Sequence, residues 1–510
     1  MINPEDLSKI LDTAHLVSTD NFGGVGRVWW PVFGWSDEQG ARLHREVLPQ
    51  LTEDERVALV DPADPRISGA PRRWLVHVGA GEQTSVKWLL DGVRQALAAV
   101  ATTGRRSASK DRPRRVAMPV MGVGGGGFNG RRGRVINGLL GVARKAAAAY
   151  AMDVVIVAAN PSDYSALQAL RNAGHGRSLP AAEEQVAQRL AALARAGQLA
   201  IFMGAGTGIA AGLPSWSELL ADLARRVGIK QPAQLSTLGP LDAAEVLRRA
   251  ADRRERDRPA SERRSNPLGH LVAEVIGGRS RYALSHAHLA ALDADQVITT
   301  NFDRLYEKAV REIRKKEPFV VLPETSAAAV DDATRRRPWL LKLHGDVEAP
   351  DDIVLDRRSF VRYDAKRRPL GGVLQTTLLT KHLLVVGASM TDDNVIRLIH
   401  EVAELNERPG DGCTFGTVLT LRADPMRAKL WEPEFDYVNL GRKSSDMRVA
   451  GRELEIFLDR VALLAAPRTA HLLDPRYREL LESPAERELA RIFRAAAHDH
   501  RDAGRWAAGV

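Results

Sequence analysis

A run rich in glycine directly follows a short apolar segment in the middle of the chain. The apolar segment, residues 198–203, is expected to be a buried strand, and the run extends from Gly204 to Pro214. Glycines in this position allow a tight turn and let backbone N–H groups approach a pyrophosphate. A helix that begins after the turn would direct its positive end at the same group. Taken alone, the run predicts either a phosphate-binding loop or a tight connection between a strand and a helix.

Polar or glycine-containing motifs also follow three further segments that we expect to be core strands. They occupy residues 299–303, 342–346 and 387–390. In a doubly wound sheet the carboxyl ends of the strands converge on the ligand crevice. Four motifs in this position are difficult to explain by packing alone, so they predict one ligand site built from four strand ends.

Taken together, the four motifs resemble those of the sirtuin superfamily, in the same order and with matching spacing over residues 190–465. The matching residues are Gly204, Ala205, Gly206, Thr207, Gly212, Leu213, Pro214, Thr300, Asn301, Phe302, Asp303, Leu343, His344, Gly345, Gly387, Ala388 and Ser389. The resemblance implies an α/β fold with a Rossmann-like, sirtuin-type parallel sheet. It also implies a domain that binds NAD and cleaves the nicotinamide–ribose bond.

The sequence departs from the sirtuin deacylases in its small domain. Its single cysteine, Cys413, excludes their four-cysteine zinc ribbon. Ser215 and Trp216 replace the Asp-Phe-Arg expected there, and a charged, helical insert is predicted at 214–292. With these features the chain is similar to the NAD-consuming sirtuin-like domains of bacterial anti-phage systems, including Thoeris. Gly208 stands where those domains usually carry Ser, which leaves the details of phosphate or ribose contact open.

The resemblance also indicates which residues act, with NAD as the substrate and no zinc. Asn301 and His344 are the predicted catalytic residues. An Asn amide can position a water or a ribose hydroxyl, and a His can act as a base near neutral pH. The residues expected to contact NAD are Gly204, Ala205, Gly206, Thr207, Gly212, Leu213, Pro214, Trp216, Thr300, Asp303, Gly387 and Ser389.

Several polar residues near these motifs have a structural alternative. Asp303 is expected either to orient its loop and contact the nicotinamide side, or to cap the following helix. Ser389 with Asp392 or Asp393 is expected either to contact the adenosine ribose or to cap the helix predicted at 394–402. The two histidines of residues 286–288 favour helix packing over a metal site, because no further ligands lie nearby in the sequence. We expect no metal.

The first 175 residues alternate strand-like and helix-like segments, which predicts a mixed or parallel sheet covered by helices. Strands are expected at 26–33, 73–79, 115–121 and 153–158. The loop Gly124, Gly125, Gly126, Gly127 follows the third of these strands and suits a phosphate. The region resembles a macro domain, which binds ADP-ribose derivatives; the alternative is an α/β scaffold with a flexible glycine loop. By analogy with the defence proteins, where the NAD-consuming domain is paired with a nucleotide sensor, we expect a sensing domain here.

The whole chain has 510 residues, of which 44% are hydrophobic and 27% charged, so it can bury large cores. We expect a macro-like domain at 1–175, a sirtuin-like domain at 180–465 and a helical C-terminal tail at 466–510. The net charge of +9 allows a nucleic-acid partner without requiring one. The first residues lack the order of a signal peptide, and no apolar stretch is long enough for a bilayer. We expect a cytoplasmic homo-oligomer with no membrane contact.

These observations predict an NAD glycohydrolase that releases nicotinamide and ADP-ribose, or a cyclic form. It would act as an anti-phage abortive-infection effector, activated by a nucleotide or infection signal at the N-terminal domain. Two alternatives stay open at this point. One is a module that binds NAD or ADP-ribose without turnover and joins a nucleic-acid or protein partner. The other is an enzyme of protein ADP-ribosylation.

Overall fold

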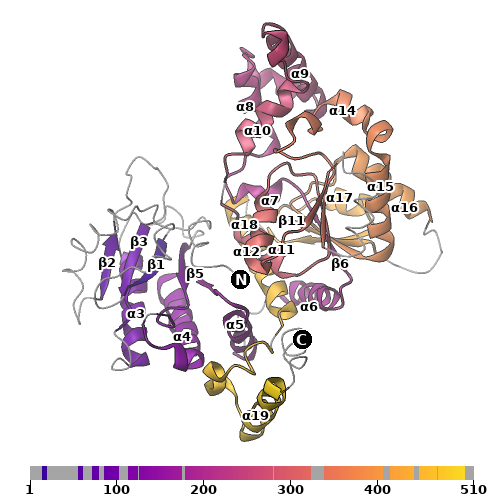
Figure 1. Ribbon diagram of the computed structural model, residues 1–510. Coiled ribbons are helices and arrows are strands. Elements are labelled where there is room, and N and C mark those ends of the chain that lie inside the picture. Colours follow the sequence, from indigo (N-terminus) through magenta and orange to yellow (C-terminus); the bar gives the residue numbers. More distant parts are fainter. Residues whose placement is uncertain are drawn as a thin grey trace. The chain divides into compact units, whose positions relative to one another are not determined.

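The computed structural model describes residues 14–19, 56–60, 72–79, 85–102, 113–124, 126–174, 179–279, 281–322, 338–405, 414–441, 447–467 and 469–499. The chain divides into two compact units (Figure 1). The first unit combines residues 1–178 with 466–510, and the second contains residues 179–465. The strand predicted at 26–33 lies outside the described residues, as do Gly125 and Cys413.

The first unit contains a five-stranded sheet in the order β2-β3-β1-β4-β5. Its strands are β1 (Ala14–Thr19), β2 (Val57–Val60), β3 (Arg72–His77), β4 (Arg114–Pro119) and β5 (Met152–Val157). Strand β2 pairs antiparallel with β3, and the other pairings are parallel. This is an α/β arrangement with a mixed sheet, as the alternation of segments predicts.

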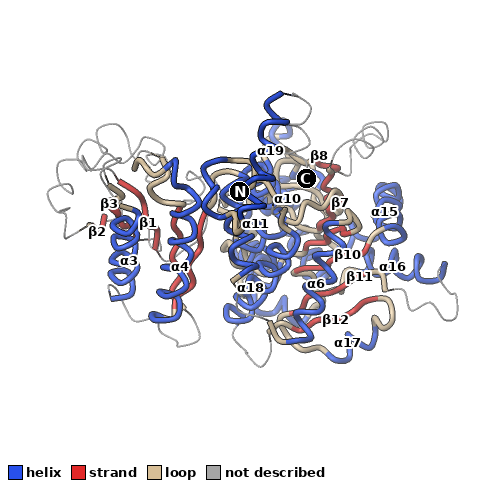
Figure 2. Tube along the Cα trace, turned by 90° about the horizontal axis from the view of Figure 1, so that it is seen from below, coloured by secondary structure: helices blue, strands red, loops and turns tan. Residues whose placement is uncertain are grey.

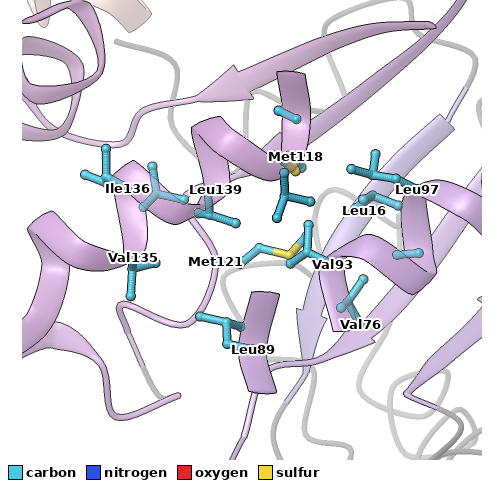
Figure 3. Close-up of a cluster of buried hydrophobic side chains, with 14 of the residues drawn as sticks. Leu16, Val76, Leu89, Val93, Leu97, Met118, Met121, Val135, Ile136 and Leu139 are labelled. Carbon is cyan, nitrogen blue, oxygen red and sulfur yellow. The ribbon is translucent and has the colours of Figure 1, made fainter. Parts of the chain in front are cut away.

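In the described part of this unit, three helices accompany the sheet, because each carries apolar residues at helical spacing. They are α3 (Val86–Thr102), α4 (Arg132–Tyr150) and α5 (Pro161–Ala173). Figure 3 shows the resulting core, in which side chains from α3 and α4 meet those of the strands. Its labelled members are Leu16, Val76, Leu89, Val93, Leu97, Met118, Met121, Val135, Ile136 and Leu139.

The segment predicted as a C-terminal tail contributes directly to the core of the first unit. It forms η9 (Pro475–Leu480) and α19 (Pro484–Asp499). The hydroxyl of Tyr477 donates a hydrogen bond of 2.7 Å to the buried carboxylate of Asp163. The same carboxylate accepts two hydrogen bonds from Arg132, at 2.6 and 2.7 Å. Burial and this hydrogen bond both raise the pKa of Tyr477, so the phenol stays neutral and the segment remains tied to α5.

The second unit contains a seven-stranded sheet in the order β12-β11-β10-β6-β7-β9-β8. The strands are β6 (Leu199–Met203), β7 (Gln296–Thr299), β8 (Phe319–Val321), β9 (Trp339–Lys342), β10 (His382–Val386), β11 (Gly416–Thr420) and β12 (Phe435–Asn439). Every pairing is parallel. Parallel strands covered on both faces read as continuous apolar runs, and all five residues of β6 are buried.

Helices cover both faces of this sheet (Figure 2). Helices α15 (Tyr363–Thr380) and α16 (Asp393–Leu405) pack on one face, in a cluster that includes Ala200 and Phe202 of β6. On the other side lie α6 (Ala181–Arg195), α11 (Leu284–Ala291) and α18 (Met447–Ala465), and α12 (Leu305–Arg314) packs against α11. A short helix, α17 (Pro425–Leu430), precedes β12.

The insert between β6 and β7 is helical. It contains α8 (Trp216–Arg226), α9 (Pro240–Arg256) and α10 (Pro267–Ile276) ahead of α11. Figure 1 shows α8, α9 and α10 gathered beyond one end of the sheet, near α14 (Arg357–Val361). Asp242 of α9 pairs with Arg357 of α14 through hydrogen bonds of 2.8 and 3.2 Å. None of the helices in the described ranges combines the length and apolarity needed to cross a membrane.

Candidate functional site

Two glycine turns interlock at the carboxyl ends of β6 and β10. The N–H of Gly206 donates to the carbonyl of Gly387 at 2.9 Å. A Cβ added at Gly204 would lie 2.6 Å from the carbonyl oxygen of Gly387. Gly387 has a φ of +70°, and a Cβ there would lie 2.5 Å from the backbone nitrogen of Thr207. The backbones therefore approach more closely than any side chain would permit.

Gly387→Ala is consequently expected to destabilise the second unit by about 1–3 kcal/mol, through overpacking and an unfavourable φ. Urea unfolding followed by tryptophan fluorescence measures this change. Gly372→Ala is the matched control, because a Cβ at Gly372 in α15 would meet no atom within 4 Å. This control is expected to stabilise the protein by about 0.5–1 kcal/mol. Equal effects of the two substitutions would contradict the interlocked turns.

Asn301 follows β7 and contacts the glycine turn directly. Its Nδ2 donates to the carbonyl of Gly204 at 3.1 Å and to Oγ1 of Thr207 at 3.2 Å. That hydroxyl itself donates to the Gly204 carbonyl at 2.8 Å, so both partners of Nδ2 are acceptors and fix the orientation of the amide. Oδ1 of Asn301 is buried without a hydrogen-bond partner among the described residues. It is thus free to accept a hydrogen bond from a ligand hydroxyl or a water.

His344 follows β9 and is buried. Its Nε2 lies 3.1 Å from Oδ2 of Asp392, and its ring packs edge-on against Phe360 with centroids 5.1 Å apart. The next residue, Gly345, has a φ of +96°, and a Cβ there would lie 2.8 Å from the carbonyl oxygen of Asp352. A glycine is therefore required for the turn that follows the histidine.

A buried lysine supports the loop that carries Asn301. Nζ of Lys342 lies 2.7 Å from Oδ2 of Asp346 and 3.1 Å from Oε1 of Glu307. It also donates to the backbone carbonyl of Asp303 at 2.6 Å. Burial alone would lower the pKa of Lys342, but the neighbouring carboxylates reverse the shift and raise it. The ammonium group stays charged and holds the ends of β7 and β9 together.

These strand ends enclose a cavity of about 700 Å³. Most of the predicted site residues line it, namely Asn301, His344, Gly204, Ala205, Leu213, Pro214, Trp216, Thr300, Asp303, Gly387 and Ser389. Gly206, Thr207 and Gly212 do not line it. The N–H of Gly206 donates to the carbonyl of Gly387, Thr207 is buried, and Gly212 has a φ of +80°. The four motifs thus meet at one site.

Apart from Trp216, the helical insert supplies cavity-lining residues that sequence reasoning missed. Leu219 of α8, Pro240 and Leu241 of α9, and Ile276 of α10 line the cavity. Phe360 and Arg357 of α14 complete this side. The apolar spacing of the insert predicts helices, but it does not tell which of their faces turns toward the sheet.

Asp303 and Asp392, for which the sequence allows either a helix cap or a ligand contact, each bond to the start of a helix. Oδ1 of Asp303 accepts a hydrogen bond of 2.9 Å from the N–H of Leu305 at the start of α12. Oδ1 of Asp392 accepts from Asn394 and Val395 at 3.1 Å each, and so caps α16. Both aspartates also line the cavity, so capping and ligand contact are compatible.

His286 and Gly208 are explained by packing. His286 is buried within α11, where its Nδ1 accepts a hydrogen bond of 3.2 Å from the N–H of Ala283. Burial lowers the pKa of His286, so the ring stays neutral.

A Cβ at Gly208 would lie 2.6 Å from Cδ1 of Leu213, which lines the cavity. Over the part of the chain that the structure describes, no group of three or more His, Cys, Asp or Glu side chains could hold a metal ion.

A known protein family matches the region of the chain that carries three of these motifs. Residues 295–434, which carry the motifs after β7, β9 and β10, match the SIR2-like domain family. The second unit therefore contains a sirtuin-like domain.

Curated proteins that are similar to this chain include NAD(+) hydrolases named ThsA. The protein from Bacillus cereus (strain MSX-D12) is 27% identical over 209 residues, which are 41% of this chain and 40% of that protein. The protein from Enterococcus faecium is 30% identical over 219 residues, 42% of each chain. The protein from Cytobacillus dafuensis is 25% identical over 211 residues, 41% of this chain and 39% of that protein. The matched region thus spans roughly two fifths of these relatives.

Proposed function

We propose that this chain is an NAD glycohydrolase whose active site is the cavity of the second unit. The observation that carries the proposal is the meeting of Asn301 and His344, from two different strand ends, at one cavity with the glycine turn of Gly204. The volume of about 700 Å³ is in the range of cofactor pockets. The names of the ThsA relatives support the same activity.

The proposed reaction breaks the bond between the nicotinamide nitrogen and C1′ of the ribose. A water oxygen forms the new bond to C1′, and the products are nicotinamide, ADP-ribose and a proton. Oδ1 of Asn301 would accept a hydrogen bond from the water or a ribose hydroxyl, and His344 would take up the proton. The backbone N–H groups of the turn at Gly204 would face the diphosphate. Attack by a hydroxyl of the same nucleotide in place of water would give the cyclic product.

For the first unit we propose a nucleotide-sensing role toward ligands of the ADP-ribose type. The loop of Gly124, Gly126 and Gly127 follows β4, and Nη1 of Arg132 donates to the carbonyl of Val123 at 3.3 Å. Arg132 is fixed by the buried Asp163, so it anchors the start of the loop, in which Gly124 and Gly127 are exposed. The resemblance to a macro domain supports this role. We further propose anti-phage defence through NAD depletion, with control by self-association.

The identity of the products tests this function against its rivals. The full chain is incubated with NAD labelled on the adenylate phosphate, with and without added ADP-ribose or its cyclic forms. We expect the label in free ADP-ribose or a cyclic product, with faster conversion when the nucleotide is present. Label on protein would favour ADP-ribosylation instead. Unchanged NAD that remains bound to the chain would favour a binding module.

Two glycine variants separate the sensor from the active site. A Cβ at Gly126 would lie 2.9 Å from the Cα of Gly122, so Gly126→Ala must displace the loop. A Cβ at Gly130 would meet nothing within 4 Å, which makes Gly130→Ala the matched control. The response to nucleotide is expected to disappear only in Gly126→Ala. If both variants respond like the wild type, the first unit is not the sensor.

A further inference from the structure

The carboxylate of Asp392 is held on one side and faces His344 on the other. Its Oδ1 accepts two hydrogen bonds of 3.1 Å, from the backbone N–H groups of Asn394 and Val395. Its Oδ2 lies 3.1 Å from Nε2 of His344. The pair meets the distance but not the angle of a hydrogen bond, and Nε2 of His344 has no hydrogen-bond partner among the described residues. The two oxygens of Asp392 thus face different groups, and the helix start fixes the direction in which Oδ2 points.

The electrostatics of Asp392 agree with a charged carboxylate. Burial raises its pKa, but His344 and the two backbone N–H groups outweigh this effect and lower it. The imidazole is confined as well. Its ring meets Phe360 and Tyr363 edge-on, with centroids 5.1 and 6.3 Å away. The ring can turn little without losing these contacts.

This pairing would decide which ring nitrogen of His344 carries the proton. A carboxylate next to Nε2 favours a hydrogen on that atom, and Nδ1 then keeps the free lone pair that a base needs. After Nδ1 takes up a proton, the same carboxylate stabilises the imidazolium. A helix cap alone would require only Oδ1, so the placement of Oδ2 is left unexplained by capping.

We infer that Asp392 is a positioning residue, which sets the tautomer and orientation of His344 for the proton transfer. The inference rests on the proposed function, since it assigns His344 the role of base. It differs from a direct contact of Asp392 with the adenosine ribose, because Asp392 then acts only through His344.

A double substitution tests whether Asp392 acts through His344. Asp392→Asn keeps a side-chain oxygen for the cap but removes the charge. We expect it to lower kcat for nicotinamide release by up to on the order of 10²-fold, with little change in KM. Introduced into His344→Ala, it is expected to cause no further loss, because its effect is transmitted by the imidazole. An equal loss in both backgrounds would overturn the inference and favour a direct contact.

Asp393→Asn is the matched control, since it removes the same charge from the neighbouring residue of α16. Its effect is expected to be the same with and without His344. A second readout does not depend on NAD cleavage. In the full chain labelled with ¹⁵N-histidine, His344→Ala identifies the His344 signals. We expect these to report a hydrogen on Nε2 in the wild type and in Asp393→Asn, and a changed tautomer in Asp392→Asn.

Identical His344 signals in the wild type and Asp392→Asn would overturn the positioning role, whether or not NAD is cleaved. A changed tautomer without any nicotinamide release would instead keep the pairing and reject the proposed reaction.

Discussion

Nicotinamide release is expected to fall by about 10²–10⁴-fold when His344 is replaced by Ala, because the imidazole that takes up the proton is lost. Asn301→Ala is expected to cause a loss of similar size, since it removes both the free Oδ1 and the two hydrogen bonds to the glycine turn. Steady-state release of nicotinamide measures both effects. NAD binding, measured in parallel, separates a failure of chemistry from a failure of binding.

His400→Ala is the matched control for the histidine. His400 is exposed on α16 and stacks on Trp431, with ring centroids 5.2 Å apart, and it does not line the cavity. Its removal is expected to leave the rate nearly unchanged. A loss below tenfold in His344→Ala, or an equal loss in His400→Ala, would exclude His344 as the base.

Lys342→Met is expected to destabilise the second unit by about 3–5 kcal/mol, because it leaves buried carboxylates without their counter-ion. Glu307 and Asp346 each lie within 3.1 Å of Nζ and are buried. Urea unfolding followed by tryptophan fluorescence measures this loss.

Two comparisons make the result specific. Lys308→Met, next to Glu307 on α12, is expected to cost less than about 1 kcal/mol, because its ammonium is exposed and bonds only a backbone carbonyl in the described structure. The triple change Lys342→Met, Glu307→Gln and Asp346→Asn is expected to recover most of the loss, since no buried charge remains. A single change that costs no more than Lys308→Met would contradict the buried network.

The strand ends of the second unit could be predicted from the sequence because their signals are local. A buried parallel strand appears in the sequence as an apolar run, and the chain must turn after it. This pattern predicts that Gly204, Asn301, His344 and Gly387 follow the ends of four strands. Parallel pairing then brings them to the same edge of the sheet, which is where the structure has them.

The cavity wall and the buried lysine could not be predicted in this way. Whether Leu219 or Leu220 of α8 turns toward the cavity depends on how the insert packs, which is a tertiary property. Lys342 reads from sequence as the polar end of a strand, and its partner Glu307 lies 35 residues away. Nothing local indicates that the two are buried together.

The packing partner of the C-terminal segment could not be predicted from the sequence either. Its apolar spacing predicts a helix that packs against some surface, but not which one. Tyr477 bonds Asp163 across 314 positions of the chain. Only a folded structure reveals that residues 469–499 belong to the first unit.

The most direct test of the proposed activity is the release of nicotinamide by the purified full chain. The protein is incubated with NAD in the absence and presence of ADP-ribose and its cyclic forms, beside Asn301→Ala and His344→Ala. The predicted result is nicotinamide release by the wild type in at least one of these conditions, at a rate about 10²–10⁴-fold above that of either variant. NAD that binds but stays intact under every condition would contradict the glycohydrolase and point to a binding module.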